Sequence, residues 1–273
     1  MNPLDLPLHV ETHGLDPEPD VDVVLLLHGY GGSTYTWRYW VPHLAKRAHV
    51  VLVDMKGFGL APKPDDGRYT AEDQAELIYR LILQRGFTNL TLVGHSFGGA
   101  VSLLVALRLN DEGARRLLRL VLVSSAAYPQ SLPPFVKLAR YSRLCRIALR
   151  LIGATRLVRF VLRSIVYNPE VVHESQVLAY ADPLATPEGR RAYLDAALQI
   201  VPKNPEALTS RFREIACPTL LIWGKHDRVV PLWVGERLKA EMPDARLHVF
   251  DHCGHIPPEE LPEDTWARLE AFL

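Results

Sequence analysis

Cysteine is scarce in this chain, which has three among its 273 residues: Cys145, Cys217 and Cys253. They lie far apart in the sequence, and no pair has the short spacing that metal ligands usually show. A disulfide framework is equally unexpected, because scattered reduced cysteines are typical of intracellular proteins. We therefore expect no metal site, no cofactor and a cytoplasmic location.

Net charge is absent as well, since 31 Lys and Arg residues balance 31 Asp and Glu residues. This balance argues against a nucleic-acid partner, which requires an excess of basic charge. Apolar runs such as VDVVLLLH at 21–28 are far too short to cross a bilayer. The first residues include prolines and acids in place of the basic and apolar stretches of a signal peptide. We expect no membrane span, and the oligomeric state stays open.

Short apolar runs alternate with segments of helical spacing along most of the chain. Continuous apolar runs suit strands that are buried on both faces, as in a parallel sheet. They occur at 23–28, 49–54, 90–94, 118–124, 219–223 and 246–250, and the helical segments lie at 36–47, 70–85, 98–110 and 262–273. This order predicts an α/β fold with a mostly parallel, doubly wound central sheet. Thr70 and Asp73 form a capping-box pattern at the start of one helix.

Residues 129–217 interrupt this alternation, because they contain no convincing strand and are bounded by prolines. We expect them to form an inserted helical lid, with residues 1–128 and 218–273 forming the core. No Asp or Glu occurs from Gly113 to Pro169, and basic residues recur there at helical spacing: Lys137, Arg140, Arg143, Arg146, Arg150, Arg156, Arg159 and Arg163. The basic face is either simply solvated or a site of peripheral contact with anionic lipid surfaces or substrates.

A G-x-S-x-G motif marks the candidate nucleophile. It reads Gly94-His95-Ser96-Phe97-Gly98, and it lies between a predicted buried strand and a predicted helix. This setting is typical of a nucleophile elbow, a tight turn that exposes a serine at the carboxyl edge of the sheet. A glycine-rich turn with an incidental serine is the alternative explanation.

The chain resembles the α/β-hydrolase superfamily over nearly its whole length apart from the lid. The motifs that carry the resemblance are HGYGG at 28–32, DMKGFG at 54–59, GHSFGG at 94–99, WGKHDRVVP at 223–231 and HCGHIP at 252–257. In such enzymes the Ser, the acid and the His follow one another in the chain. The resemblance implies an oxyanion hole made of the backbone N–H groups of Tyr30 and Phe97, whose side chains also become candidate pocket residues.

The acid and the base are selected by position and by this resemblance. Asp227 follows a predicted strand by a short turn, whereas the strand end at 124–129 carries no carboxylate. His252 and His255 both follow the last predicted strand, and the family pattern G-H-x-P selects His255. The expected triad is therefore Ser96, His255 and Asp227.

These residues predict a serine hydrolase, specifically a carboxylesterase that cleaves small-to-medium hydrophobic esters through an acyl-enzyme. The hydrophobic preference rests on the apolar inner face expected of the lid. Two alternatives stay open: a C–C bond hydrolase of the meta-cleavage type, and a hydrolase-like ligand-binding protein with little turnover. The segment HGYGGST departs from the HGSGPG pattern typical of meta-cleavage hydrolases, which favours the esterase.

Overall fold

A seven-stranded sheet forms the centre of the computed structural model, which describes residues 6–113, 116–132, 136–137, 153–202 and 204–273. The strand order is β1-β3-β2-β4-β5-β6-β7. The strands are β1 (His9–Gly14), β2 (Val23–Leu27), β3 (His49–Asp54), β4 (Leu90–His95), β5 (Leu117–Val123), β6 (Thr219–Gly224) and β7 (Ala245–Phe250). All neighbours pair in parallel except β1, which runs antiparallel to β3. The predicted mostly parallel α/β fold is confirmed.

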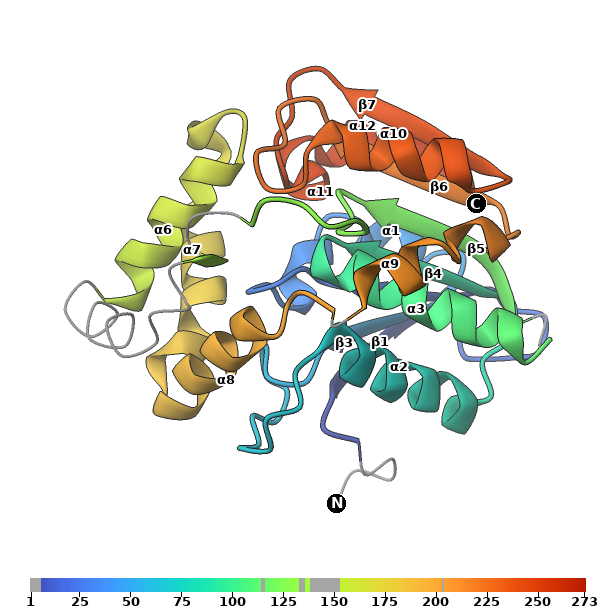
Figure 1. Cartoon of the computed structure of the whole chain (residues 1–273), viewed down its shortest axis with the longest axis horizontal. Helices are drawn as coiled ribbons and strands as arrows, with labels where there is room; N and C mark the ends of the chain where they lie inside the picture. The colour runs from blue at the N-terminus through green and yellow to red at the C-terminus, as the bar shows by residue number, and fades with distance from the viewer. Residues whose placement is uncertain (1–5, 114–115, 133–135, 138–152, 203) are drawn as a thin grey trace.

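Alternate residues of each inner strand enter the two hydrophobic cores on opposite faces of the sheet. On β2, for example, Leu25 and Leu27 pack on one face, and Val24 and Leu26 pack on the other. The first face is covered by α2 (Ala71–Arg85), α3 (Phe97–Asp111) and α10 (Leu232–Glu241), and the second by η1 (Thr34–Trp37), α1 (Val41–Leu44) and α12 (Pro262–Glu270). Helices on both faces make the sheet doubly wound (Figure 1).

Strand β1 is the one strand that our sequence analysis missed. Its sequence, HVETHG, is polar, and its residues are half-buried or exposed at the edge of the sheet. An edge strand of this kind lacks the continuous apolar run by which the inner strands were identified. The capping box predicted for α2 is present, because Thr70 Oγ1 accepts from Asp73 N and Thr70 N donates to the Asp73 carboxylate.

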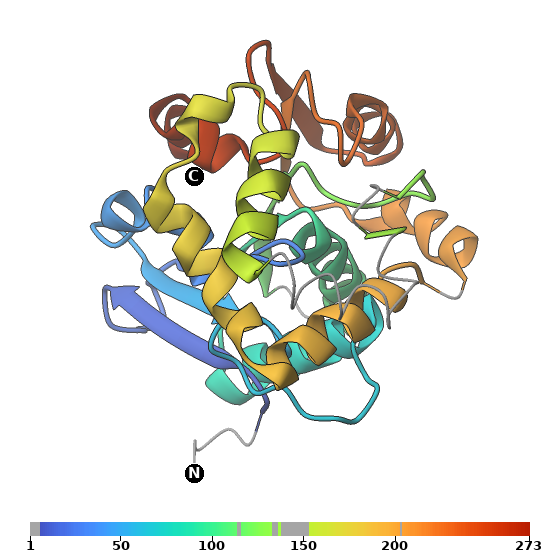
Figure 2. The same cartoon turned by 90° about the vertical axis from the view of Figure 1, so that its left-hand side faces the viewer.

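Helices fill the described part of the chain between β5 and β6. They are α6 (Ala154–Ile165), η2 (Pro169–Val171), α7 (Glu174–Ala181), η3 (Asp182–Ala185), α8 (Pro187–Leu198), α9 (Pro205–Thr209) and η4 (Phe212–Glu214). In Figure 1, α6, α7 and α8 stand together on the left of the molecule, apart from the sheet, and in Figure 2 this side of the molecule faces the viewer. We call this segment the helical insertion, and the limits 129 and 217 stay a prediction.

Half of the eight basic residues that suggested contact with anionic surfaces lie outside the described residues, namely Arg140, Arg143, Arg146 and Arg150. On α6, Arg159 pairs with Glu174 at 2.6 Å, and Arg156 and Arg163 are exposed. Peripheral surface contact therefore stays a prediction. Within the described residues, no helix combines the length and the apolar character needed to cross a membrane.

Candidate functional site

Ser96 occupies the sharp turn between β4 and α3. Its backbone φ angle of +52° lies in a region that residues other than glycine rarely adopt, so the turn holds the serine in a strained conformation. The glycines around it are required by space: a Cβ on Gly94 would lie 2.4 Å from Gly98 O, and a Cβ on Gly98 would lie 2.4 Å from His28 O. The turn therefore has the geometry expected of a nucleophile elbow.

The three residues of the expected triad lie side by side. The distance between Ser96 Oγ and His255 Nε2 is 3.0 Å, and that between His255 Nδ1 and Asp227 Oδ2 is 2.8 Å. All three residues are at least nine-tenths buried. In this arrangement the neutral imidazole donates its Nδ1 proton to the carboxylate and offers Nε2 as an acceptor for the Ser96 hydroxyl proton.

Backbone groups orient the acid. Asp227 lies in the loop after β6, and its Oδ1 accepts hydrogen bonds from the N–H groups of Val229 and Val230, both at 2.8 Å. These two bonds turn the other oxygen, Oδ2, towards His255. The tautomer of the imidazole is therefore set by the loop backbone as well as by the carboxylate.

The backbone of His255 is held on both sides. Its N–H donates to Ile165 O at 2.9 Å, and its carbonyl lies 2.8 Å from His95 Nε2. Burial is the main cause that lowers the pKa of His95 to about 3; the neighbouring His255 ring acts in the same direction, and the hydrogen bond to the His255 carbonyl opposes it. His95 is therefore neutral at pH 7 and donates Nε2–H to the carbonyl. His95 was not among the predicted site residues, since nothing in its position in the motif indicates a hydrogen bond to the carbonyl of His255, 160 residues away.

The two residues expected to supply the oxyanion donors line the same cavity. Phe97 is the first residue of α3, and N–H groups in the first turn of a helix have no acceptor within the helix. Tyr30 lies in the turn after β2, which His28 supports: His28 Nδ1 lies 2.7 Å from Gly29 O, and its Nε2 accepts from Met55 N at 3.1 Å. The role of both N–H groups as oxyanion donors stays a prediction.

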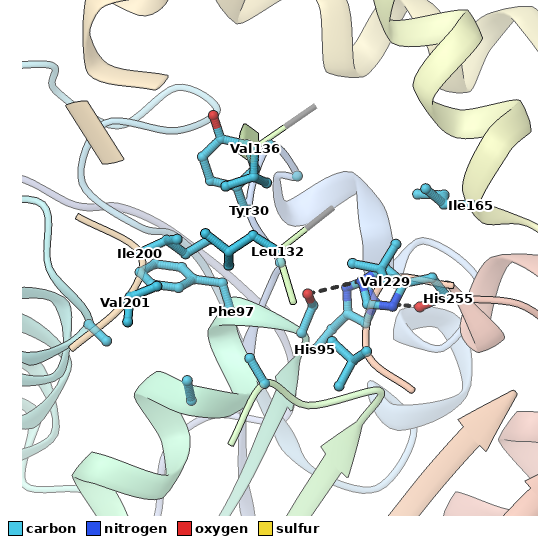
Figure 3. A pocket seen from close by; sticks show the side chains of 18 of the residues that line it. Tyr30, His95, Phe97, Leu132, Val136, Ile165, Ile200, Val201, Val229 and His255 are labelled. Atoms are coloured by element: carbon cyan, nitrogen blue, oxygen red, sulfur yellow. Dashed lines mark hydrogen bonds between the residues drawn. The ribbon is translucent and has the colours of Figure 1, made fainter. Parts of the chain in front are cut away.

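A cavity of about 410 Å³ opens above Ser96 and His255. Its wall is mostly apolar and is formed by the core on one side and by the helical insertion on the other. Leu132, Ile200 and Val201 gather beside Phe97, whereas Ile165 lies on the far side of His255 (Figure 3). The side chain of Tyr30 connects the core to the helical insertion, because its hydroxyl donates to Tyr193 O on α8 at 2.7 Å. Both side chains named as pocket candidates, Tyr30 and Phe97, line the cavity.

One wall of this cavity is polar. The buried carboxylate of Glu259 forms an ion pair with Arg38, and it accepts from Tyr180 Oη at 2.7 Å and from Gln176 Nε2 at 2.9 Å. Thr36 Oγ1 lies 3.0 Å from Tyr180 Oη. Burial raises the pKa of Glu259, against the opposing effect of Arg38. This network joins α7 of the helical insertion to the core, and our sequence analysis did not identify it.

Among the described residues, no group of three or more His, Cys, Asp and Glu side chains could hold a metal ion. His252, the alternative base, is exposed, and its ring lies 5.4 Å from that of Tyr167. The structure therefore brings His255, and not His252, to Ser96.

The fold agrees with comparisons to known proteins. The family described as "alpha/beta hydrolase fold" matches residues 22–262, so the chain belongs to the α/β-hydrolase family. A crystal structure of an α/β-hydrolase-fold protein from Burkholderia ambifaria superposes with a TM-score of 0.83 and 25% identity, over 96% of this chain and 93% of that one.

Curated relatives narrow the class to hydrolases. A 2-hydroxy-6-oxononadienedioate/2-hydroxy-6-oxononatrienedioate hydrolase of Pseudomonas putida is 30% identical, over 92% of this chain and 86% of the relative. Lipase 3 of Moraxella sp. is 27% identical, over 98% of this chain and 81% of the relative. This chain is a hydrolase of the α/β fold, and these two relatives are named as a hydrolase of 2-hydroxy-6-oxo acids and as a lipase.

Proposed function

We propose that this protein is a serine carboxylesterase, with Ser96 as nucleophile, His255 as general base and Asp227 as the acid that orients the histidine. The observation that carries the proposal is the continuous hydrogen-bonded series from Ser96 Oγ through His255 to Asp227 Oδ2, on the floor of a mostly apolar cavity. Nucleophile and base within hydrogen-bond reach, with a third group orienting the base, are the requirements for covalent catalysis.

In the proposed reaction, His255 Nε2 takes the proton from Ser96 Oγ as the oxygen attacks the ester carbonyl. The N–H groups of Tyr30 and Phe97 donate to the resulting oxyanion. His255 then gives the proton to the leaving alcohol, and the acyl group stays on Ser96. A water molecule, deprotonated by His255, releases the acid in the second half of the reaction.

The cavity supports a hydrophobic substrate. Its apolar region beside Phe97, lined by Leu132, Ile200 and Val201, offers a place for the acyl chain. Burial of each additional CH₂ group of a substrate in such a region contributes about 0.8 kcal/mol. We therefore propose that esters with medium-length acyl chains are cleaved faster than acetates.

Hydrolysis of p-nitrophenyl esters, from acetate to long acyl chains, tests the proposal. Multiple turnover that disappears in Ser96→Ala is the expected result, with an optimum of chain length set by the cavity. Absence of turnover across the series, with a single slow acylation and long retention of the ligand, would favour a binding protein with little turnover.

Cleavage of a C–C bond is the second candidate, and the observation in its favour is the name of the Pseudomonas putida relative. The substrate in that name is a dicarboxylate, which needs cationic partners. Arg190 is the one Arg or Lys among the described residues that line the cavity. Its Nη1 donates to Leu184 O and Ala185 O, at 2.9 Å and 2.7 Å. The carboxylate of Glu259, which also lines the cavity, disfavours an anionic substrate. Turnover of a 2-hydroxy-6-oxo-dienoate at a higher kcat/KM than any ester would reverse this ranking.

A further inference from the structure

Two adjacent glutamates follow His255 in α11 (Pro257–Glu260), and their carboxylates have different surroundings. Glu259 contacts side chains of the cavity wall, as described above. Glu260, in contrast, accepts hydrogen bonds from backbone N–H groups. Our sequence analysis assigned a role to neither residue.

The carboxylate of Glu260 holds the chain on both sides of His255. The N–H of Gly254 lies 3.0 Å from Oε1 and 2.9 Å from Oε2, and the N–H of Ile256 lies 3.1 Å from Oε1. Both donors are the immediate neighbours of His255 in the chain. Glu260 is itself nine-tenths buried, so these bonds are shielded from water.

The same carboxylate also holds the helical insertion. Tyr167, just beyond the end of α6, donates its N–H to Glu260 Oε2 at 2.7 Å. Two residues earlier, Ile165 O accepts from the N–H of His255 at 2.9 Å. Space is tight at this junction, since a Cβ on Gly254 would lie 2.4 Å from Ile165 O. The end of α6 and the histidine loop are thus joined by a backbone hydrogen bond, and the Glu260 carboxylate bridges them.

We propose that Glu260 is a positioning residue for the reaction, which fixes the backbone of His255 against the end of α6 and so keeps the imidazole between Ser96 and Asp227. The inference rests on the proposed function of this triad. A carboxylate suits the task because it has acceptor capacity for all three N–H groups and no donor of its own. An amide in its place turns a donor towards at least one of these N–H groups.

Glu260→Gln is therefore the decisive substitution, and Glu263→Gln is its matched control. Glu263 is an exposed residue in the first turn of α12. With a p-nitrophenyl ester, we expect kcat of Glu260→Gln to fall by about 10- to 100-fold through misplacement of the imidazole. KM should stay close to the wild-type value, because Glu260 does not line the cavity. Labelling of Ser96 by a fluorophosphonate, measured by mass spectrometry, should slow by a similar factor.

A spectroscopic signature separates positioning from general loss of stability. The proton between His255 Nδ1 and Asp227 gives a low-field resonance in the proton NMR spectrum, which we expect in the wild-type protein and in Glu263→Gln, and broadened or lost in folded Glu260→Gln. Should Glu260→Gln fail to fold, Glu260→Asp serves in its place. The aspartate keeps both acceptor oxygens, but its side chain is one methylene shorter, so the oxygens lie further from the three backbone N–H groups. We expect that variant to show the same fall in kcat at retained KM.

Wild-type kcat and an unchanged low-field resonance in a Glu260 variant would overturn the inference and leave the esterase proposal intact. Failure of the wild-type protein to hydrolyse esters and to react with the fluorophosphonate would instead contradict the proposed function. In that case the NMR comparison still decides whether Glu260 positions His255.

Discussion

Substitution of Asp227 by Asn has an outcome that the hydrogen bonds of the acid determine. Asp227 Oδ1 accepts from the N–H groups of Val229 and Val230. In the variant, only the amide oxygen can occupy this position without leaving two buried donors unpaired, which would cost about 1–3 kcal/mol each. The amide NH₂ group must then face His255 Nδ1, the atom that donates to Oδ2 in the wild-type protein.

This orientation reverses the tautomer of the imidazole. His255 Nδ1 becomes the acceptor, and the ring proton moves to Nε2, where it faces Ser96 Oγ. The nitrogen that should take the serine proton no longer has a free lone pair. Loss of the orienting acid in a Ser-His-Asp triad lowers kcat by about 10⁴-fold, which corresponds to about 5 kcal/mol of transition-state stabilisation.

Steady-state hydrolysis of a p-nitrophenyl ester by Asp227→Asn measures this loss. The matched control is Asp251→Asn, since Asp251 is exposed and pairs with Lys225 on the surface; we expect that variant to retain wild-type activity. A folded Asp227→Asn protein with kcat near the wild-type value would refute the assignment of Asp227 and the argument about the tautomer.

Three further predictions concern the surroundings of the triad. Gly98→Ala forces a Cβ against His28 O; we expect a loss of about 1–3 kcal/mol in denaturant unfolding, and unchanged stability would contradict the close contact. His95 has a pKa of about 3 when folded and an ordinary value of 6.5, so below pH 6.5 the unfolded chain binds a proton that the folded protein does not. Between pH 6.5 and about 3, the free energy of unfolding should therefore decrease as the pH decreases, by at most about 1.4 kcal/mol per pH unit. This contribution should vanish in His95→Gln, and identical pH slopes in the wild-type protein and the variant would refute it. Tyr180→Phe removes a donor to the buried Glu259 and should cost about 1–3 kcal/mol in thermal unfolding, whereas unchanged stability would show that the bond is dispensable.

The inner strands and the elbow could be predicted because local physical requirements leave a mark in the sequence. Strands such as β2 and β6 are buried on both faces, so they are continuous apolar runs. The turn at Ser96 admits no side chain at Gly94 or Gly98, so the glycines are themselves the signal. The helix start at Thr70 was predictable for a similar reason, because its capping bonds are local.

Features that depend on contacts between distant segments could not be predicted. The edge strand β1 is polar and is defined only by its pairing with β3. Glu260 acquires its proposed role because α6 ends beside the histidine loop. His95 acquires its role because the carbonyl of His255 accepts a hydrogen bond from its Nε2. In each case the residue type permits many structures, and only the tertiary arrangement selects one.

The proposed function depends on formation of an acyl-enzyme at Ser96 with His255 as the base. Rapid quenching of a reaction between the protein and a p-nitrophenyl ester, followed by peptide mass spectrometry, would detect this intermediate. We expect an acyl group on the peptide that contains Ser96, absent in Ser96→Ala and formed far more slowly in His255→Ala. Ester turnover without any adduct on that peptide, or with the acyl group on another residue, would contradict the proposed function.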